Sequence, residues 1–221
     1  AAARAAVLRG SADAGRKLDA VPKAARKDPL YAFTLAEWHR RADRPDQAAK
    51  VILAVDAKAT ALHGDEWWVE RRIVSRDLME KSNHRLAYKV VANHAGGGET
   101  TLQEAYFHAG WYALRFLKDP QSALKHFDQL EKVSQKPISR ARANYWMARA
   151  EEAAGRTDNA RARYGRAAAD EFTFYGQLSR VKLGLPTLGL PPAPKPTEAD
   201  RAAFARTDLA RVLVQLLRTG R

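Results

Sequence analysis

The residues of this 221-residue chain that could do acid–base or metal chemistry include its carboxylates and histidines. The chain contains no cysteine. A thiolate nucleophile, a disulfide framework and a Cys-ligated zinc site are therefore excluded. Glu66 and Glu70 are spaced to share one face of a helix. Glycosidase carboxylates instead face each other across a cleft, about 5–9 Å apart. We therefore interpret the pair as solvated glutamates whose charge is offset by arginines and lysines close by in the sequence.

The histidines and the glycine run also lack the spacing of a reactive site. The six histidines lie at positions 39, 63, 84, 94, 108 and 126, and no two are three or four residues apart. A metal pair on a helix needs that spacing, so we predict neither a metal site nor a cofactor. The glycines at 96–98 follow a predicted helix end, which favours a flexible turn over a phosphate-binding loop. No known catalytic motif is present, and we predict no catalytic residue.

Tryptophans and arginines are the residues that could bind a ligand, by stacking on sugars or bases and by pairing with anions. Trp67 and Trp68 are adjacent. Because successive helix side chains point roughly 100° apart, we expect one of the two near the surface or on a concave wall of the domain. Trp111 and Trp146 have the helical spacing of core residues. The predicted ligand-binding set is Trp67, Trp68, Arg71, Arg72, Arg115, Arg142 and Arg149.

Composition narrows the class of protein. Lysine and arginine number 38 against 25 aspartates and glutamates, a net charge of +13 that favours binding to nucleic acid, an anionic membrane surface or an acidic cell-wall polymer. Hydrophobic residues make up 46% of the chain, which excludes a disordered or fibrous protein. No apolar run approaches the roughly 20 residues of a transmembrane helix. The chain starts without methionine, and we expect it to be a fragment of a longer, processed protein.

The elements that must position these residues are α-helices, about ten or eleven of them, since apolar residues recur with helical spacing and no run is typical of a strand. Four segments repeat a short turn followed by an anchor alanine, with spacings of 39, 36 and 37 residues. The anchors are Ala48, Ala87, Ala123 and Ala160, each followed four residues later by a large apolar residue: Ile52, Val91, Phe127 and Tyr164. A small residue lets the second helix of a hairpin approach the first. The repeat predicts an all-α, irregular tetratricopeptide-like α-hairpin solenoid.

We expect three parts along the chain. Residues 1–185 form the repeat domain. Residues 186–196 hold five prolines and form an extended connector. Residues 197–221 form a helix that leads toward a further C-terminal region. Thr197 and Asp200 have the spacing of a capping box at the start of that helix.

Several stretches resemble the superhelical domain of soluble lytic murein transglycosylases. They are residues 67–72 (WWVERR), 110–117 (GWYALRFL), 123–127 (ALKHF), 138–150 (ISRARANYWMARA) and 173–178 (TFYGQL). The resemblance spans roughly residues 30–185, and its most specific parts are SRARANYW and FYG. In that family a ring of α-hairpins precedes a lysozyme-like domain. That domain cleaves the MurNAc–GlcNAc bond of peptidoglycan in the periplasm and leaves a 1,6-anhydro end.

The resemblance implies a non-catalytic role for this chain. The family's catalytic glutamate followed by serine, and its Gly-Leu-Met-Gln stretch, do not occur here, so no catalytic residue is carried over. We expect the parent protein to be the transglycosylase and this domain to bind or position the glycan strand in the periplasm. The expected partners are peptidoglycan glycan strands and other cell-wall proteins, and no nucleic acid.

Two other functions remain open. A stand-alone tetratricopeptide-like scaffold would bind a peptide or a partner protein in a concave groove lined by Asn, Lys and Arg. A helical-repeat nucleic-acid binder is suggested by the net charge alone, and its binding would depend steeply on salt.

Overall fold

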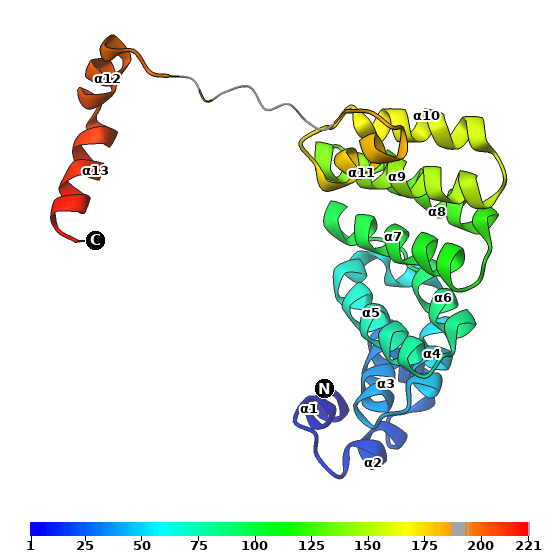
Figure 1. The fold of residues 1–221 in the computed structure, drawn as a ribbon. Helices are drawn as coiled ribbons and strands as arrows, with labels where there is room; N and C mark the ends of the chain where they lie inside the picture. Colours follow the sequence, from blue (N-terminus) through cyan, green and yellow to red (C-terminus); the bar gives the residue numbers. More distant parts are fainter. Residues whose placement is uncertain (187–192, 194, 221) are drawn as a thin grey trace. The chain divides into compact units, whose positions relative to one another are not determined.

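The computed structural model describes residues 1–186, 193 and 195–220, and every regular element in these residues is helical (Figure 1). Thirteen α-helices are present and the described residues contain no strand, which confirms the all-α prediction. The expected number of ten or eleven helices is too low. Short helices such as α1 (Ala2–Leu8) and α2 (Ala14–Asp19) fall below the length over which helical periodicity can be read. The chain divides into two units, Ala1–Thr187 and Leu188–Arg221.

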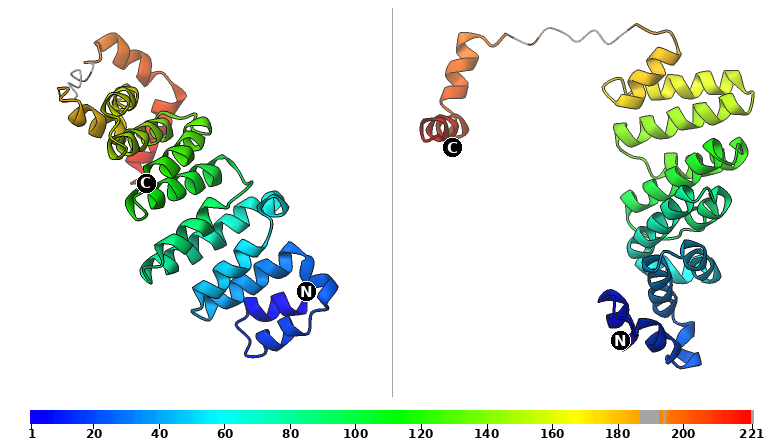
Figure 2. Two further views of the ribbon diagram at one scale, coloured as in Figure 1. Left: turned by 90° about the vertical axis from the view of Figure 1, so that its right-hand side faces the viewer. Right: turned by 60° about the horizontal axis from the view of Figure 1, so that its bottom comes forward.

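The first unit contains the longer helices, which follow one another along its length (Figures 1 and 2). After a 3-10 helix at Lys23–Lys27 come α3 (Pro29–Arg41) and α4 (Pro45–Ala54), a 3-10 helix at Ala57–His63, α5 (Gly64–Glu80), α6 (His84–Ala92), α7 (Glu99–Arg115), α8 (Pro120–Lys132), α9 (Pro137–Ala153), α10 (Thr157–Ala168) and α11 (Phe174–Lys182). Four helical hairpins result: α3–α4, α5–α6, α7–α8 and α9–α10. The first helix of each hairpin also contacts the first helix of the next hairpin; for example, α5 contacts α7.

The anchor alanines of these hairpins are buried. Ala48, Ala87 and Ala123 are fully buried and Ala160 is 2% exposed. The large apolar residues four positions later are buried as well: Ile52, Val91, Phe127 and Tyr164. The packing expected from the repeat is therefore confirmed at all four positions. At Gly110 of α7, a Cβ atom would lie 2.4 Å from the Phe127 ring, so glycine is required where α8 crosses α7.

The turns inside the four hairpins share one backbone conformation. Asp43, Ser82, Lys118 and Gly155 have φ values of 54°, 59°, 55° and 74°, and each lies five residues before its anchor alanine. A left-handed residue just after a helix lets the following amides reach the last free carbonyls. Gly155 adopts this conformation without strain because it has no Cβ atom. Asp43, Ser82 and Lys118 adopt it with side chains that make it less favourable.

The core is a row of clusters and not one central core. The largest joins α3, α4, α5, α6 and α7, and two further clusters are centred on Phe127 and on Tyr164. A separate cluster around Val7 and Leu18 joins α1 and α2 to α3. Each hairpin is therefore stabilised mainly by its immediate neighbours.

The second unit contains α12 (Glu198–Ala205) and α13 (Asp208–Arg218). The predicted capping box is confirmed: Thr197 Oγ1 accepts from the Asp200 amide, and Asp200 accepts from the Thr197 amide at 2.9 Å. The prediction of one helix is wrong, because Thr207 caps a second helix by accepting from the Ala210 amide. The predicted connector, 186–196, lies mostly outside the described residues.

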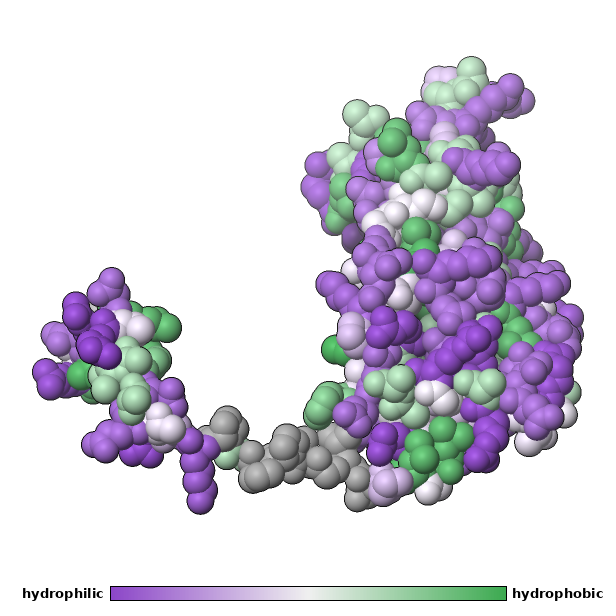
Figure 3. Space-filling model, turned by 90° about the horizontal axis from the view of Figure 1, so that it is seen from above, coloured by the Kyte–Doolittle hydropathy of each residue, from purple (hydrophilic) through white to green (hydrophobic). Residues whose placement is uncertain are grey.

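Figure 3 shows a mostly hydrophilic surface with smaller apolar patches.

Candidate functional site

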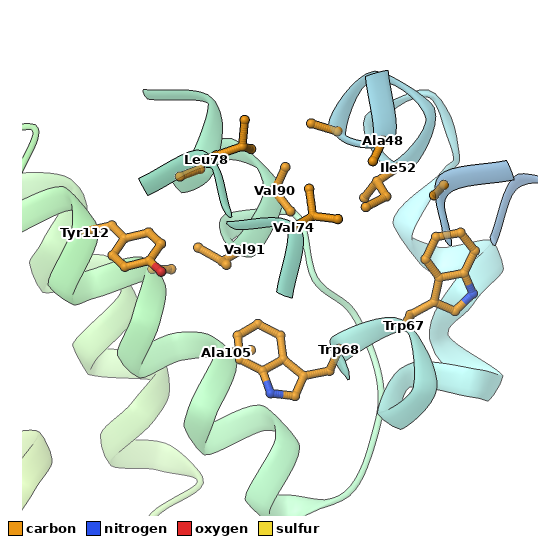
Figure 4. Close-up of a cluster of buried hydrophobic side chains, with 14 residues drawn as sticks. Ala48, Ile52, Trp67, Trp68, Val74, Leu78, Val90, Val91, Ala105 and Tyr112 are labelled. Atoms are coloured by element: carbon orange, nitrogen blue, oxygen red, sulfur yellow. The ribbon is translucent and has the colours of Figure 1, made fainter. Parts of the chain in front are cut away.

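The adjacent tryptophans of α5 are both buried. Trp67 is 3% exposed and Trp68 is 2% exposed, and their indoles point to different sides (Figure 4). Trp67 packs edge-on against Phe33 of α3 with ring centroids 5.2 Å apart, and Trp68 Nε1 donates to Glu104 Oε2 of α7 at 2.8 Å. The expectation that one of them lies near the surface is wrong. Because α5 has α3 on one side and α7 on the other, each indole has its own neighbouring helix to pack against.

Two of the predicted arginines follow on the same helix. Arg71 is fully buried, and its Nη1 donates to the Val90 carbonyl at 2.8 Å. Burial lowers the pKa of Arg71 to about 10. Arg72 is half-buried and forms an ion pair with Glu104, with Nη1 2.9 Å from Oε2. Arg71 and the two tryptophans therefore do not belong to a surface site, and Arg72 is already neutralised.

The three remaining predicted arginines have different surroundings. Arg115 is exposed in the last turn of α7. Arg149 Nε lies 3.1 Å from Glu152 Oε2, and Arg149 Nη1 donates to the Tyr145 hydroxyl at 3.3 Å. Arg142 is half-buried on α9, with its guanidinium 4.8 Å from the centre of the Phe107 ring. The structure does not bring the seven predicted residues together.

A different set of residues forms a groove on the first helices of successive hairpins. The groove has a volume of about 740 Å³ and is lined by α5, the α7 region and single residues of α9 and α11. Its lining residues are Arg76, Met79, Glu80, Phe107, His108, Trp111, Tyr112, Phe116, Trp146 and Tyr175. The volume falls within the roughly 300–1,000 Å³ of small-molecule sites. Six of the ten lining side chains are aromatic, which makes ring stacking the main interaction that the groove offers.

The aromatic rings hold one another in place. Trp111 lies edge-on to Phe116 with centroids 5.3 Å apart, and Phe107 lies edge-on to Trp146 at 5.9 Å. Tyr112 is 3% exposed, and its hydroxyl lies 3.4 Å from Ser75 Oγ of α5. Fixed rings lose little conformational entropy when a ligand packs against them.

A few polar groups complete the groove. His108 Nδ1 donates to the Glu104 carbonyl at 2.7 Å, and burial lowers the pKa of His108. The imidazole is therefore neutral at pH 7, with Nε2 as an acceptor. Arg76 and Glu80 are exposed and supply one charge of each sign. The buried Nε1 of Trp146 has no hydrogen-bond partner among the described residues.

The carboxylate pair of α5 has a structural role that differs from the expected one. Glu70 is 3% exposed and accepts two hydrogen bonds from Arg40 of α3, at 2.8 and 3.0 Å. Burial raises the pKa of Glu70, although the bonds from Arg40 act in the other direction. The expectation of a solvated pair offset by nearby residues is wrong for Glu70, because its partner comes from the preceding hairpin. Glu66 is exposed.

The glycine run at 96–98 is held by a carboxylate of the protein itself. Asp65 Oδ1 accepts from the Gly98 amide at 2.9 Å and from Thr101 Oγ1 at 2.5 Å. These bonds lower the pKa of Asp65. The first turn of α7 is thus satisfied without a phosphate, and the turn is pinned by hydrogen bonds where a flexible one was expected.

Four groove residues carry no binding signal when they are considered singly: Phe107, His108, Phe116 and Tyr175. Trp111 and Trp146, which we expected in the core, pack against core clusters and also line the groove. The position of a residue relative to its anchor alanine is the sequence feature that could have predicted the groove. Trp111 and Trp146 precede their anchor alanines by 12 and 14 residues, so they lie at similar levels of consecutive first helices.

Comparisons with protein-family models, curated proteins and solved structures find no match. Among the described residues, no group of three or more histidines and carboxylates is arranged to hold a metal ion. In that same part of the chain, no helix is both long and apolar enough to cross a bilayer. The function must therefore be argued from the groove and from the sequence.

Proposed function

We propose that this chain is a non-catalytic α-hairpin solenoid domain that binds peptidoglycan glycan strands, as part of a periplasmic lytic murein transglycosylase. The parent enzyme would cleave the MurNAc–GlcNAc bond with a 1,6-anhydro product, and this domain would position the strand. The aromatic groove is the observation that carries the proposal. The sequence resemblance and the net charge of +13 support it.

The groove fits a glycan chemically. A pyranose ring has an apolar C–H face that packs on aromatic rings, while its hydroxyl and acetamido groups form hydrogen bonds at its edge. Trp111, Phe116 and Trp146 offer such rings. Arg76, Glu80 and the neutral His108 supply donors and acceptors next to them.

The repeated hairpins support the solenoid part of the proposal. All four share the left-handed turn residue five positions before a buried anchor alanine. Equal turns place the first helices of the hairpins in similar positions, so a row of such helices can present one continuous binding surface. The groove extends in this way over three first helices, α5, α7 and α9, and reaches α11.

The lining residues favour binding over catalysis. Glu80 is the only carboxylate among them, and it is exposed to water. A carboxyl group that acts as general acid at neutral pH needs an apolar surrounding. The lining also differs from the Asn/Lys/Arg-rich groove expected of a peptide-binding scaffold, since Arg76 is its only residue of those types.

Co-sedimentation of the purified chain with peptidoglycan sacculi tests the proposal. We expect binding that weakens as salt increases, because the chain is basic and peptide stems carry carboxylates. Trp111→Ala should weaken binding about tenfold, since one stacked ring contributes about 1–3 kcal/mol by analogy with base stacking. Phe172→Ala is the matched control, because Phe172 is 72% exposed and outside the groove lining. Absent binding, or equal losses in both variants, would contradict the proposal.

A further inference from the structure

We propose that Arg142 makes the groove selective for acidic glycans by binding a carboxylate of the sugar or of its acyl substituent. This inference rests on the proposed function, because it needs a glycan in the groove. It adds the class of sugar that is preferred and the side chain that selects it.

Arg142 stands out among the half-buried arginines because it lacks a counter-ion. Most of the others have a carboxylate partner: Arg40 with Glu70, Arg72 with Glu104, Arg149 with Glu152, Arg156 with Glu151, Arg163 with Glu131 and Arg180 with Glu171. Within the described residues Arg142 has no ion pair, and its buried Nε has no hydrogen-bond partner. A partly desolvated charge without a partner is costly, which points to a role outside the folded chain itself.

The carboxylate that acts on the charge of Arg142 is already engaged. Glu104 attracts Arg142 electrostatically, but it accepts hydrogen bonds from Trp68 Nε1 and Arg72 Nη1. Burial alone would raise the pKa of Glu104; these partners instead hold it below its ordinary value. Glu104 therefore stays with α5, and the Arg142 guanidinium remains available to another anion.

Arg142 lies next to the groove, although it is not among the lining residues. Its guanidinium lies over Phe107, a groove-lining ring, and Trp146 follows one helical turn later on the same face of α9. Phe107 contacts both, since its ring is 4.8 Å from the Arg142 guanidinium carbon and 5.9 Å from the Trp146 ring. A sugar stacked on this aromatic cluster would bring its substituents within reach of Arg142.

Two other half-buried arginines lack a carboxylate partner and show why the groove matters. Arg4 lies 5.5 Å from the Phe33 ring, and Arg44 lies 4.2 Å from the Trp38 ring. Neither Phe33 nor Trp38 lines the groove. Arg142 differs because its unpaired guanidinium lies over Phe107, a ring that lines a groove of ligand size. A guanidinium binds a carboxylate through two parallel N–H donors.

The test compares two ligands that differ only in charge. The probes are a GlcNAc–MurNAc disaccharide with its free lactyl carboxylate and the same disaccharide as its carboxamide, both titrated by tryptophan fluorescence. We expect the wild type to bind the acid about tenfold more tightly, the size of a charge-assisted hydrogen bond. Arg142→Gln should remove that preference and leave the affinity for the amide unchanged. Arg149→Gln, on the same helix, should keep the preference, because Arg149 already has a carboxylate partner in Glu152.

Each outcome has a distinct meaning. Equal binding of acid and amide by the wild type overturns the selectivity and leaves the proposed function standing. A preference that survives in Arg142→Gln assigns the selectivity to another residue and overturns the role of Arg142. Binding of neither probe overturns the proposed function as well. If Arg142→Gln does not fold, Arg142→Lys takes its place: it keeps the charge but loses the two parallel N–H donors, so the preference for the acid should shrink, and an unchanged preference overturns the role of Arg142.

Discussion

Two regions of the first unit contain the same residue types and use them in opposite ways. In α5, Trp67, Trp68 and Arg71 are buried and form part of the structural core. In α7 and α9, Trp111 and Trp146 are half-buried along a groove, and Arg142 is half-buried over Phe107 of its lining. Residue type therefore does not separate the core from the groove in this chain. The position of a residue relative to its anchor alanine does.

The register explains the difference. Trp67 and Trp68 precede their anchor, Ala87, by 20 and 19 residues, which places them in the first turn of α5 between α3 and α7. Trp111 precedes its anchor by only 12 residues and lies near the end of α7, where the groove opens. A tryptophan early in a first helix thus packs against both neighbouring hairpins, and one in the later half borders the groove.

Removing a buried indole should have the largest effect. Trp68→Ala should lower the free energy of unfolding by about 3–5 kcal/mol, because it leaves a cavity and removes a donor from Glu104. Trp111→Ala should cost only about 1–2 kcal/mol, since its ring is already partly solvated. Urea denaturation followed by circular dichroism measures both. Equal losses would remove the contrast between the two regions.

The arginines give the next comparison. Arg40→Gln should cost about 3 kcal/mol, because it leaves Glu70 buried without its cation. Arg142→Gln should change stability by less than about 1 kcal/mol, because no carboxylate loses a partner. Chemical denaturation of both variants at neutral pH measures the difference. If Arg142→Gln proved as costly as Arg40→Gln, Arg142 would have a structural role and its assignment to ligand binding would weaken.

The pH dependence of stability should test the buried region around α5 separately. Burial against Trp68 lowers the pKa of His94 from 6.5 to about 4. Because the folded state favours the neutral imidazole, His94 contributes stability above pH 6.5 that is lost as the pH falls to about 4. His94 is partly solvated, so we expect a loss of about 1–2 kcal/mol. His94→Gln should flatten this part of the stability profile. An unchanged slope in the variant would mean that other groups cause the acid loss.

The sequence predicts the parts of the fold that depend on local chemistry. The burial of the anchor alanines and the capping box at Thr197 are confirmed, since each rests on spacing within one or two turns of helix. The groove could not be predicted in the same way. Its walls come from residues 76 to 175, and which face of a first helix stays open depends on how each hairpin stacks on the next.

Substitutions in the hairpin turns should have the smallest effect on the free energy of unfolding, and the effect should be the same in both regions. Ser82 in the α5–α6 turn and Lys118 in the α7–α8 turn have left-handed backbones that favour glycine. Ser82→Gly and Lys118→Gly should each raise the free energy of unfolding by about 0.5–1 kcal/mol, and Gly155→Ala should lower it by a similar amount. Thermal and urea denaturation measure the shifts. Equal gains would show that the two hairpins share one scaffold and differ only in which face their neighbours cover. A gain at one turn alone would show that the hairpins also differ in backbone strain, and register would then explain only part of the contrast between the regions.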